Sequence, residues 1–171
     1  MRKIIIGFSK PKNKIFPIFS WLIRLFQGGT QYSHVYIRWY SPTIGTYLTY
    51  EASGTSVKFV GEQVYEDEIT PIYEYEISIS DNIYLNLLKF CIRYSGIKYG
   101  VIQVIGIAIA LLFKLKKNPL SHGDQKQVCS EIVQRILKQI LHKDIEIDLD
   151  LVTPKNIKDF LDTQKDFKRI L

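Results

Sequence analysis

The sequence has few cysteines, and they do not form a disulfide framework. Cys91 and Cys129 are the only two among 171 residues, and no C-x-x-C pair indicates a zinc site. We therefore expect no disulfide scaffold, no metal and no cofactor. This cysteine usage is typical of a protein in a reducing compartment.

The sequence also lacks a secretory signal and a long uninterrupted apolar run. The N-terminal residues 1–7 have neither an apolar signal core nor a cleavage site, and Pro17 and Arg24 interrupt the apolar run over 15–26. The apolar stretch Val101–Phe113 is shorter than the roughly 20 residues that a membrane span needs. These absences predict a cytoplasmic protein.

Charge runs are nearly absent. The net charge is +6 and the pI is about 9.2, which permits contact with phosphate, anionic lipid or an anionic wall polymer. The basic residues are scattered, however, and only Lys114, Lys116 and Lys117 form a tight cluster. Without a basic stripe or a recognised motif, nucleic acid is not an expected partner.

Hydrophobic periodicity predicts strands first and helices after them. Residues 32–40 and 46–52 alternate around the turn 41–45 and predict a hairpin, and 3–8, 56–60, 72–79 and 145–151 are further expected strands. The first expected helices are 16–26, then 81–95 with Leu85, Leu88 and Ile92 as its core stripe, and a buried helix over 101–113. A further helix is capped by Asp124 and runs to about His142, and the last is 154–162 after the Thr153 N-cap.

The chain contains no internal repeat, no low-complexity linker and no convincing boundary. This organisation predicts a single domain over residues 1–171, of the α+β class, with an antiparallel sheet packed against helices.

Cys129 and His34 are candidates for a nucleophile and its base. A thiol attacks a carbonyl as the thiolate, which a helix N-terminus and a neighbouring imidazole favour. Cys129 lies near the start of an apolar-periodic helix, whereas His34 lies on the polar face of a strand with Val35, Ile37 and Trp39 on its core face. If the helix starts at Asp124, Cys129 receives less help from the helix dipole than if it starts near Val128.

A base histidine needs a third group that orients its ring, and Glu51 on the returning strand is the candidate. The register of the hairpin decides on which sheet face Glu51 lies. If the two residue numbers of each cross-strand pair add up to an odd number, Glu51 shares the sheet face of His34, whereas an even sum places it on the opposite face. Thr49 is the fallback on the same face as Glu51.

Each candidate also has a structural interpretation. Cys129 on an apolar helix resembles a core cysteine, His34 a surface or tyrosine-packed histidine, and Glu51 a charge at a strand end. Cys91 is expected in the core. His122, in a loop, and His142, at a helix C-terminus, are weaker candidates for a base.

Three short segments together resemble a known family. Ser33–Ile37, Tyr50–Ala52 and Val128–Val133 are similar to the motifs of the circularly permuted branch of the NlpC-type papain-like cysteine hydrolases, in which histidine and an acidic or polar residue precede the cysteine. Tyr99-Gly100 and Val152-Thr153-Pro154 fit the same pattern. The resemblance spans roughly residues 3–161. The Asn-Cys-Glu-His-Phe-type motif of the related lecithin-retinol acyltransferase-like branch is not present at Val128–Ile132.

The resemblance implies a permuted papain-like domain with Cys129 as nucleophile, His34 as general base and then acid, and Glu51 as the orienting residue. Tyr32 would assist the oxyanion or place the substrate, beside the backbone N–H of Cys129. The same resemblance implies a thiol hydrolase that cleaves an amide, with peptidoglycan stem peptides as the first substrate class and a phage or bacterial source.

Two alternatives remain open. The first is a lipid amidase, thioesterase or acyltransferase at a membrane surface, because Val101–Phe113 and the following lysines resemble a membrane-contacting hairpin. The second is a catalytically inactive ligand-binding module with Cys129 in the core.

Overall fold

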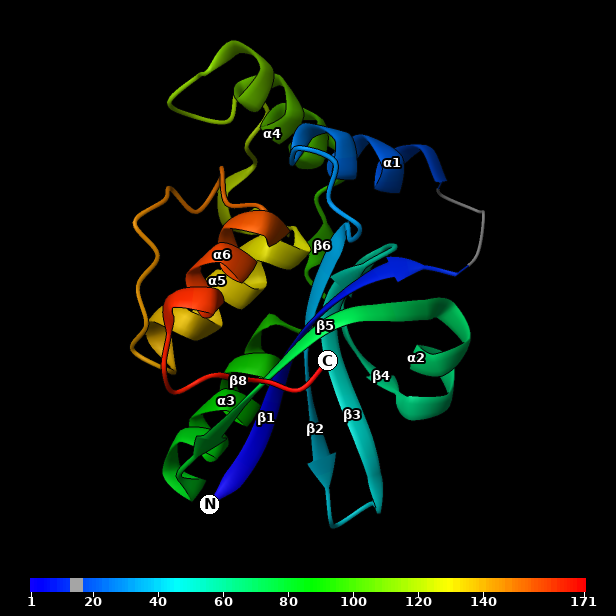
Figure 1. Cartoon of the computed structure of the whole chain (residues 1–171), viewed down its shortest axis with the longest axis vertical. Helices are drawn as coiled ribbons and strands as arrows, with labels where there is room; N and C mark the ends of the chain where they lie inside the picture. Colours follow the sequence, from blue (N-terminus) through cyan, green and yellow to red (C-terminus); the bar gives the residue numbers. More distant parts are fainter. Residues whose placement is uncertain (13–16) are drawn as a thin grey trace.

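An eight-stranded sheet with helices on both sides organises the chain in the computed structural model, which describes residues 1–12 and 17–171 (Figure 1). The strands are β1 (Arg2–Pro11), β2 (His34–Ser41), β3 (Thr46–Ser53), β4 (Ser56–Gly61), β5 (Ile69–Ile79), β6 (Lys98–Tyr99), β7 (Lys126–Gln127) and β8 (Lys168–Arg169). The helices are α1 (Pro17–Phe26), α2 (Glu62–Glu68), α3 (Asp81–Tyr94), α4 (Val101–Phe113), α5 (Cys129–Gln139) and α6 (Pro154–Thr163), with a short 3-10 turn at Gly123–Gln125.

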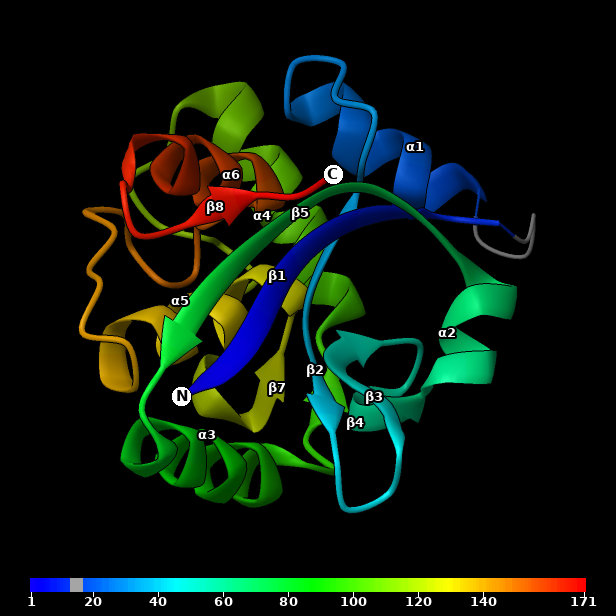
Figure 2. The same ribbon diagram turned by 60° about the horizontal axis from the view of Figure 1, so that its bottom comes forward.

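The strand order is β7-β6-β4-β3-β2-β1-β5-β8, and every pair is antiparallel except β6–β7. The long strands β1 and β5 lie side by side and curl strongly, as Figure 2 shows. The α+β class and the predicted antiparallel sheet are therefore confirmed. The expected helix start at Phe16 and the loop residues up to Lys14 lie outside the described residues.

The main core lies between the sheet and the helices α3, α5 and α6. Its largest fully buried side chains come from alternate positions on the central strands and from one stripe of α5, and they include Phe8, Ile37, Trp39, Ile132 and Ile136. A second cluster of Tyr36, Val60 and Tyr65 lies under α2, on the other side of the sheet. The face of β2 that we expected to be polar is thus covered at Tyr36.

Local signals placed several element ends correctly. Gly45, at φ 69°, closes the predicted β2–β3 turn, and its N–H donates to the Ser41 carbonyl at 2.9 Å. The Ser80 side chain accepts from Ile83 N–H at the start of α3, and Thr153 and Pro154 occupy the predicted N-cap and N1 of α6.

Three expectations were wrong. Residues 145–151 were expected to form a strand but form turns. The Gln134 side chain donates hydrogen bonds to the Ile145 and Ile147 carbonyls, which in a strand would accept from a neighbouring strand. The helix expected to begin after Asp124 begins at Cys129, since Lys126 and Gln127 form β7 instead. In α3, Leu85 and Ile92 are exposed, and the buried stripe runs through Leu87, Phe90 and Cys91.

The helix α4 has the predicted bounds but is not wholly buried. Val104, Ile107 and Ala108 face the protein, whereas Leu112 and Phe113 are 62% and 67% exposed. In the described residues, no helix combines the length and the apolarity that crossing a bilayer requires.

Candidate active site

Cys129 is the first residue of α5, so its backbone N–H has no partner within the helix. Val128 is the N-cap, and its N–H donates to the Glu131 carboxylate at 3.0 Å, which holds the helix start in place. Ser130 donates to the Val152 carbonyl at 2.7 Å and joins this start to the segment before α6. The positive end of the helix dipole therefore lies at Cys129, a position that favours a thiolate.

The β2–β3 register brings Glu51 to His34. Ile37 pairs with Tyr50 and Arg38 with Thr49, so paired residues sum to an odd number and Glu51 shares the sheet face of His34. The His34 Nε2 atom lies 2.8 Å from the Glu51 carboxylate, whose other oxygen accepts from Ser53. Glu51 therefore contacts the ring through Nε2, and Nδ1 is the ring nitrogen that remains for Cys129.

His34 interacts with Cys129 as well as with Glu51. Burial disfavours the charged ring, but the charges of Cys129 and Glu51 and its hydrogen bonds to both raise the pKa of His34 to about 10. Burial likewise opposes ionisation of Glu51, yet His34, Ser53 and Lys58 hold the pKa of Glu51 below its usual range. At neutral pH the site therefore contains an imidazolium between a carboxylate and the sulfur.

A cluster of Tyr36, Tyr65 and Glu74 under α2 packs against the His34 imidazole. The Tyr36 ring stacks against His34 with centroids 6.3 Å apart, and its hydroxyl donates to Glu74 at 2.8 Å. Tyr65 contacts the same hydroxyl at 2.5 Å. Because Tyr36 is fully buried and held at its far end, its ring restricts the position of His34.

The tyrosine at the site is Tyr99 and not Tyr32. The Tyr32 ring packs edge-on against Phe8 and Tyr73. Its pKa is raised, mainly because the hydroxyl is buried and also because of the nearby charge of Asp159. These contacts give Tyr32 a packing role.

Tyr99 lies beside Cys129 because β6 pairs with β7, where Tyr99 faces Gln127. Burial and the charges of Cys129, Glu131 and Glu51 keep the pKa of Tyr99 well above its ordinary value, so its hydroxyl stays a donor. The only sequence signal for this residue was the Tyr99-Gly100 pair.

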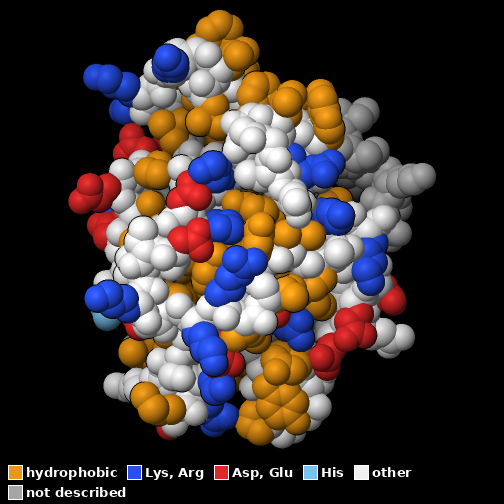
Figure 3. All heavy atoms as spheres, in the orientation of Figure 1, with side chains coloured by type: hydrophobic (Ala, Val, Ile, Leu, Met, Phe, Trp, Pro, Cys, Tyr) orange, Lys and Arg blue, Asp and Glu red, His pale blue; other side chains and the backbone are white. Residues whose placement is uncertain are grey.

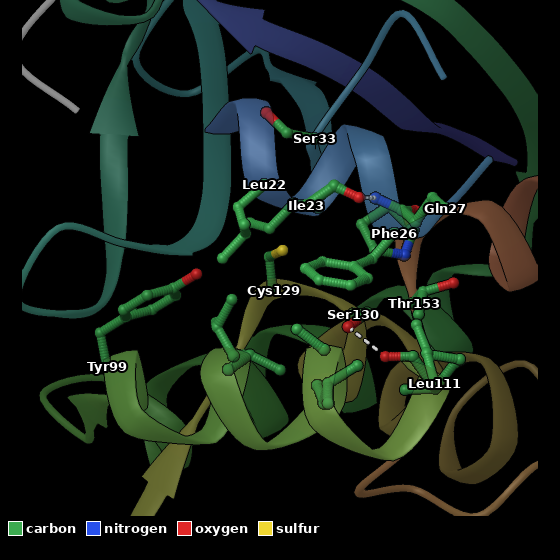
Figure 4. A pocket seen from close by; sticks show the side chains of 16 residues that line it. Leu22, Ile23, Phe26, Gln27, Ser33, Tyr99, Leu111, Cys129, Ser130 and Thr153 are labelled. Carbon is green, nitrogen blue, oxygen red and sulfur yellow. Dashed lines mark hydrogen bonds between the residues drawn. The ribbon is translucent and has the colours of Figure 1, made fainter. Parts of the chain in front are cut away.

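A pocket with about 450 Å³ of empty space, its open mouth included, lies above Cys129 between α1 and α4 (Figure 4). The sulfur and the Tyr99 hydroxyl both point into it. Among the described residues that line it there is no Lys, Arg, His, Asp or Glu. The apolar lining residues that α1 and α4 contribute are Leu22, Ile23, Phe26, Val104, Ile107, Ala108 and Leu111. The nucleophile candidate thus opens onto an apolar space.

Replacing Glu51 by glutamine should lower the pKa of His34. The carboxylate is one of the charges that raise this pKa to about 10, so without it the ring loses its proton at a pH lower by about one to three units. The NMR chemical shift of the His34 Cε1 proton, followed against pH, reports this pKa. The exposed Glu66→Gln should leave the pKa unchanged, and an unmoved pKa in Glu51→Gln would contradict the contact between Glu51 and His34.

No protein family and no curated protein sequence matches the chain. Among solved structures, the fold resembles that of the metalloprotein YiiX from Escherichia coli O157:H7, with a TM-score of 0.60 and 15% identity over 99% of this chain and 95% of that one. This likeness extends to the fold alone. In residues 1–12 and 17–171 of this chain, no group of three or more His, Cys, Asp or Glu side chains could hold a metal ion, so these residues do not fit a protein-held metal centre.

Proposed function

We propose that this chain is a thiol hydrolase of the permuted NlpC-type papain-like kind, which cleaves an amide or ester through an acyl-enzyme on Cys129. The observation that carries the proposal is the convergence of Cys129, at the first position of α5, with His34 and its 2.8 Å partner Glu51. The chain order of histidine, glutamate and cysteine and the likeness of the fold to YiiX also support it.

The reaction has two steps, acylation of Cys129 and hydrolysis of the thioester, and His34 transfers a proton in each. The Cys129 sulfur attacks the carbonyl carbon, and the C–N or C–O bond breaks as His34 gives its proton to the leaving amine or alcohol. Water then attacks the thioester, its proton passes to His34, the C–S bond breaks, and the acid leaves. The Cys129 backbone N–H and the Tyr99 hydroxyl are the donors that we assign to the developing oxyanion.

The pocket favours a second substrate class beside peptides. A peptidoglycan stem peptide carries carboxylates and amines, and the part of the pocket lining that the structure describes offers no charged side chain to pair with them. An ester, thioester or amide with an apolar acyl group matches the apolar walls from α1 and α4 better. The acyl group is therefore the part of the substrate that we place in the pocket.

Trapping the acyl-enzyme tests the nucleophile and the preference for an apolar acyl group in one experiment. The protein is mixed with p-nitrophenyl acetate, butyrate, octanoate and palmitate and with a peptide p-nitroanilide, and intact and peptide masses locate any acyl group. We expect a thioester on Cys129, forming faster as the acyl chain lengthens. Cys91 is the internal control, because it is fully buried and burial raises its pKa. Equal modification of both cysteines, or none, contradicts the proposal and favours an inactive binding module.

A further inference from the structure

One end of the molecule is apolar and basic, and its two helices, α1 and α4, also line the pocket. Figures 1 and 2 show α1 and α4 side by side beyond the end of the sheet. Their exposed apolar residues, with the lysines that follow α4, make up what we call the α1–α4 face. It comprises Trp21, Leu25, Leu111, Leu112, Phe113 and Leu115, together with Lys114, Lys116 and Lys117.

The exposure of this face is unusual for large side chains. Trp21 is 54% exposed, Leu112 62% and Phe113 67%. Figure 3 shows several apolar side chains at this end, among polar atoms and beside Lys and Arg. A contiguous apolar patch on a folded protein marks a surface that contacts a partner or a membrane.

The charges of this end identify the partner. Residues 17–29 and 101–123 contain Arg24 and the three lysines but no Asp or Glu, although Glu131, Asp148 and Asp150 line a cleft together with Lys117. A surface that combines exposed aromatic and aliphatic side chains with Arg24, Lys114 and Lys116 matches the interface of a bilayer with anionic headgroups. A protein partner would instead need shape complementarity to two convex helices.

We propose that the α1–α4 face docks on an anionic membrane and that an acyl chain of a membrane lipid enters the pocket from there. Leu111 connects the two regions, because it lines the pocket and is 40% exposed on the face. The docking is independent of the thiol chemistry, whereas the entry of the acyl chain rests on the proposed function.

Vesicle binding tests the docking, and the chain contains its own probe. Trp39 is 1% exposed in the core, so Trp21 is the tryptophan that can meet lipid. Vesicles of phosphatidylcholine with phosphatidylglycerol should bind the protein, shift its fluorescence to the blue and, when brominated, quench it. Phosphatidylcholine alone or high salt should weaken binding at least about tenfold. Wild-type protein and Cys129→Ala should behave alike.

Matched variants locate the surface. Leu112→Asp with Phe113→Asp, and separately Lys116→Glu with Lys117→Glu, should each weaken binding at least about tenfold. The controls Ile92→Asp and Lys89→Glu change exposed residues of α3, at the other end of the molecule in Figure 1, and should bind as the wild type does.

Three results would overturn the docking. These are no binding to anionic vesicles at low salt, equal losses in the α3 controls, or a concentration-dependent dimer that Leu112→Asp with Phe113→Asp dissociates, which would assign the face to a second copy. Vesicle binding with an unreactive Cys129 would leave the docking standing and remove the hydrolase. A reactive Cys129 without vesicle binding would support the hydrolase and rule out the docking.

Discussion

Replacing Cys129 by alanine should abolish turnover and acyl-enzyme formation while the protein stays folded. Removing the nucleophile of a catalytic triad costs about 10⁴–10⁶-fold in kcat. The His34–Glu51 pair, 2.8 Å apart in the wild type, should persist in the variant, but the sulfur that forms the covalent intermediate is gone. Initial rates with the p-nitrophenyl ester that acylates the wild type fastest would measure the loss.

The fold should survive because the sulfur lies at the floor of an open pocket, where a smaller side chain leaves no sealed cavity. Circular dichroism and the thermal midpoint check this point. The matched control is Cys91→Ala, which removes the same atom from the core and should lower stability without lowering kcat. Retained turnover in Cys129→Ala would refute the acyl-enzyme.

Replacing Gly7 by alanine should destabilise the protein more than other single changes to small residues of the sheet. Gly7 on β1 pairs with Tyr36 on β2, and the Tyr36 ring lies directly over it. An added Cβ would lie 2.1 Å from Cζ of that ring, a distance at which one of the two must move. The ring has little freedom, because Glu74 and Tyr65 hold its hydroxyl and His34 stacks against it.

Overpacking of this kind costs about 1–3 kcal/mol, and each kcal/mol lowers the thermal midpoint of a chain of this size by about 2–4 °C. The displaced ring should also misplace His34 and lower kcat. Urea denaturation measures the free energy of unfolding, and Tyr36→Ala as a second change should cancel most of the added cost. Gly61→Ala is the control, since its Cβ meets nothing within 4 Å at a φ of −72°. A wild-type midpoint in Gly7→Ala would contradict the packing argument.

Local patterns were sufficient for the hairpin but not for the relation between His34 and Glu51. Alternation placed both residues on strands, and the turn ending in Gly45 limited the register to two choices. The choice between an odd and an even sum needed the tertiary structure, because both registers satisfy the same turn residues and only the packing of the opposite face separates them.

The start of α5 and the identity of the active-site tyrosine depended on contacts distant in sequence. Gln127 could continue a helix by its own propensity, but its pairing with Tyr99 makes it a strand residue and moves the helix start to Cys129. The same pairing brings Tyr99 to the sulfur, whereas Tyr32, two residues before His34, turns into the aromatic packing around Phe8. A two-residue strand has no periodicity that a sequence could reveal.

By itself, the sequence determined the α+β class, the strands that carry His34 and Glu51, and the chemical types of the three candidate residues, because alternation, capping residues and turn glycines act over a few neighbours. Only the tertiary structure decided that Cys129 begins its helix beside His34, that Tyr99 lines the pocket, and that α4 exposes Leu112 and Phe113. The reason is physical: an apolar helix encodes its hydrophobicity locally, but which of its sides is covered depends on the elements that pack against it.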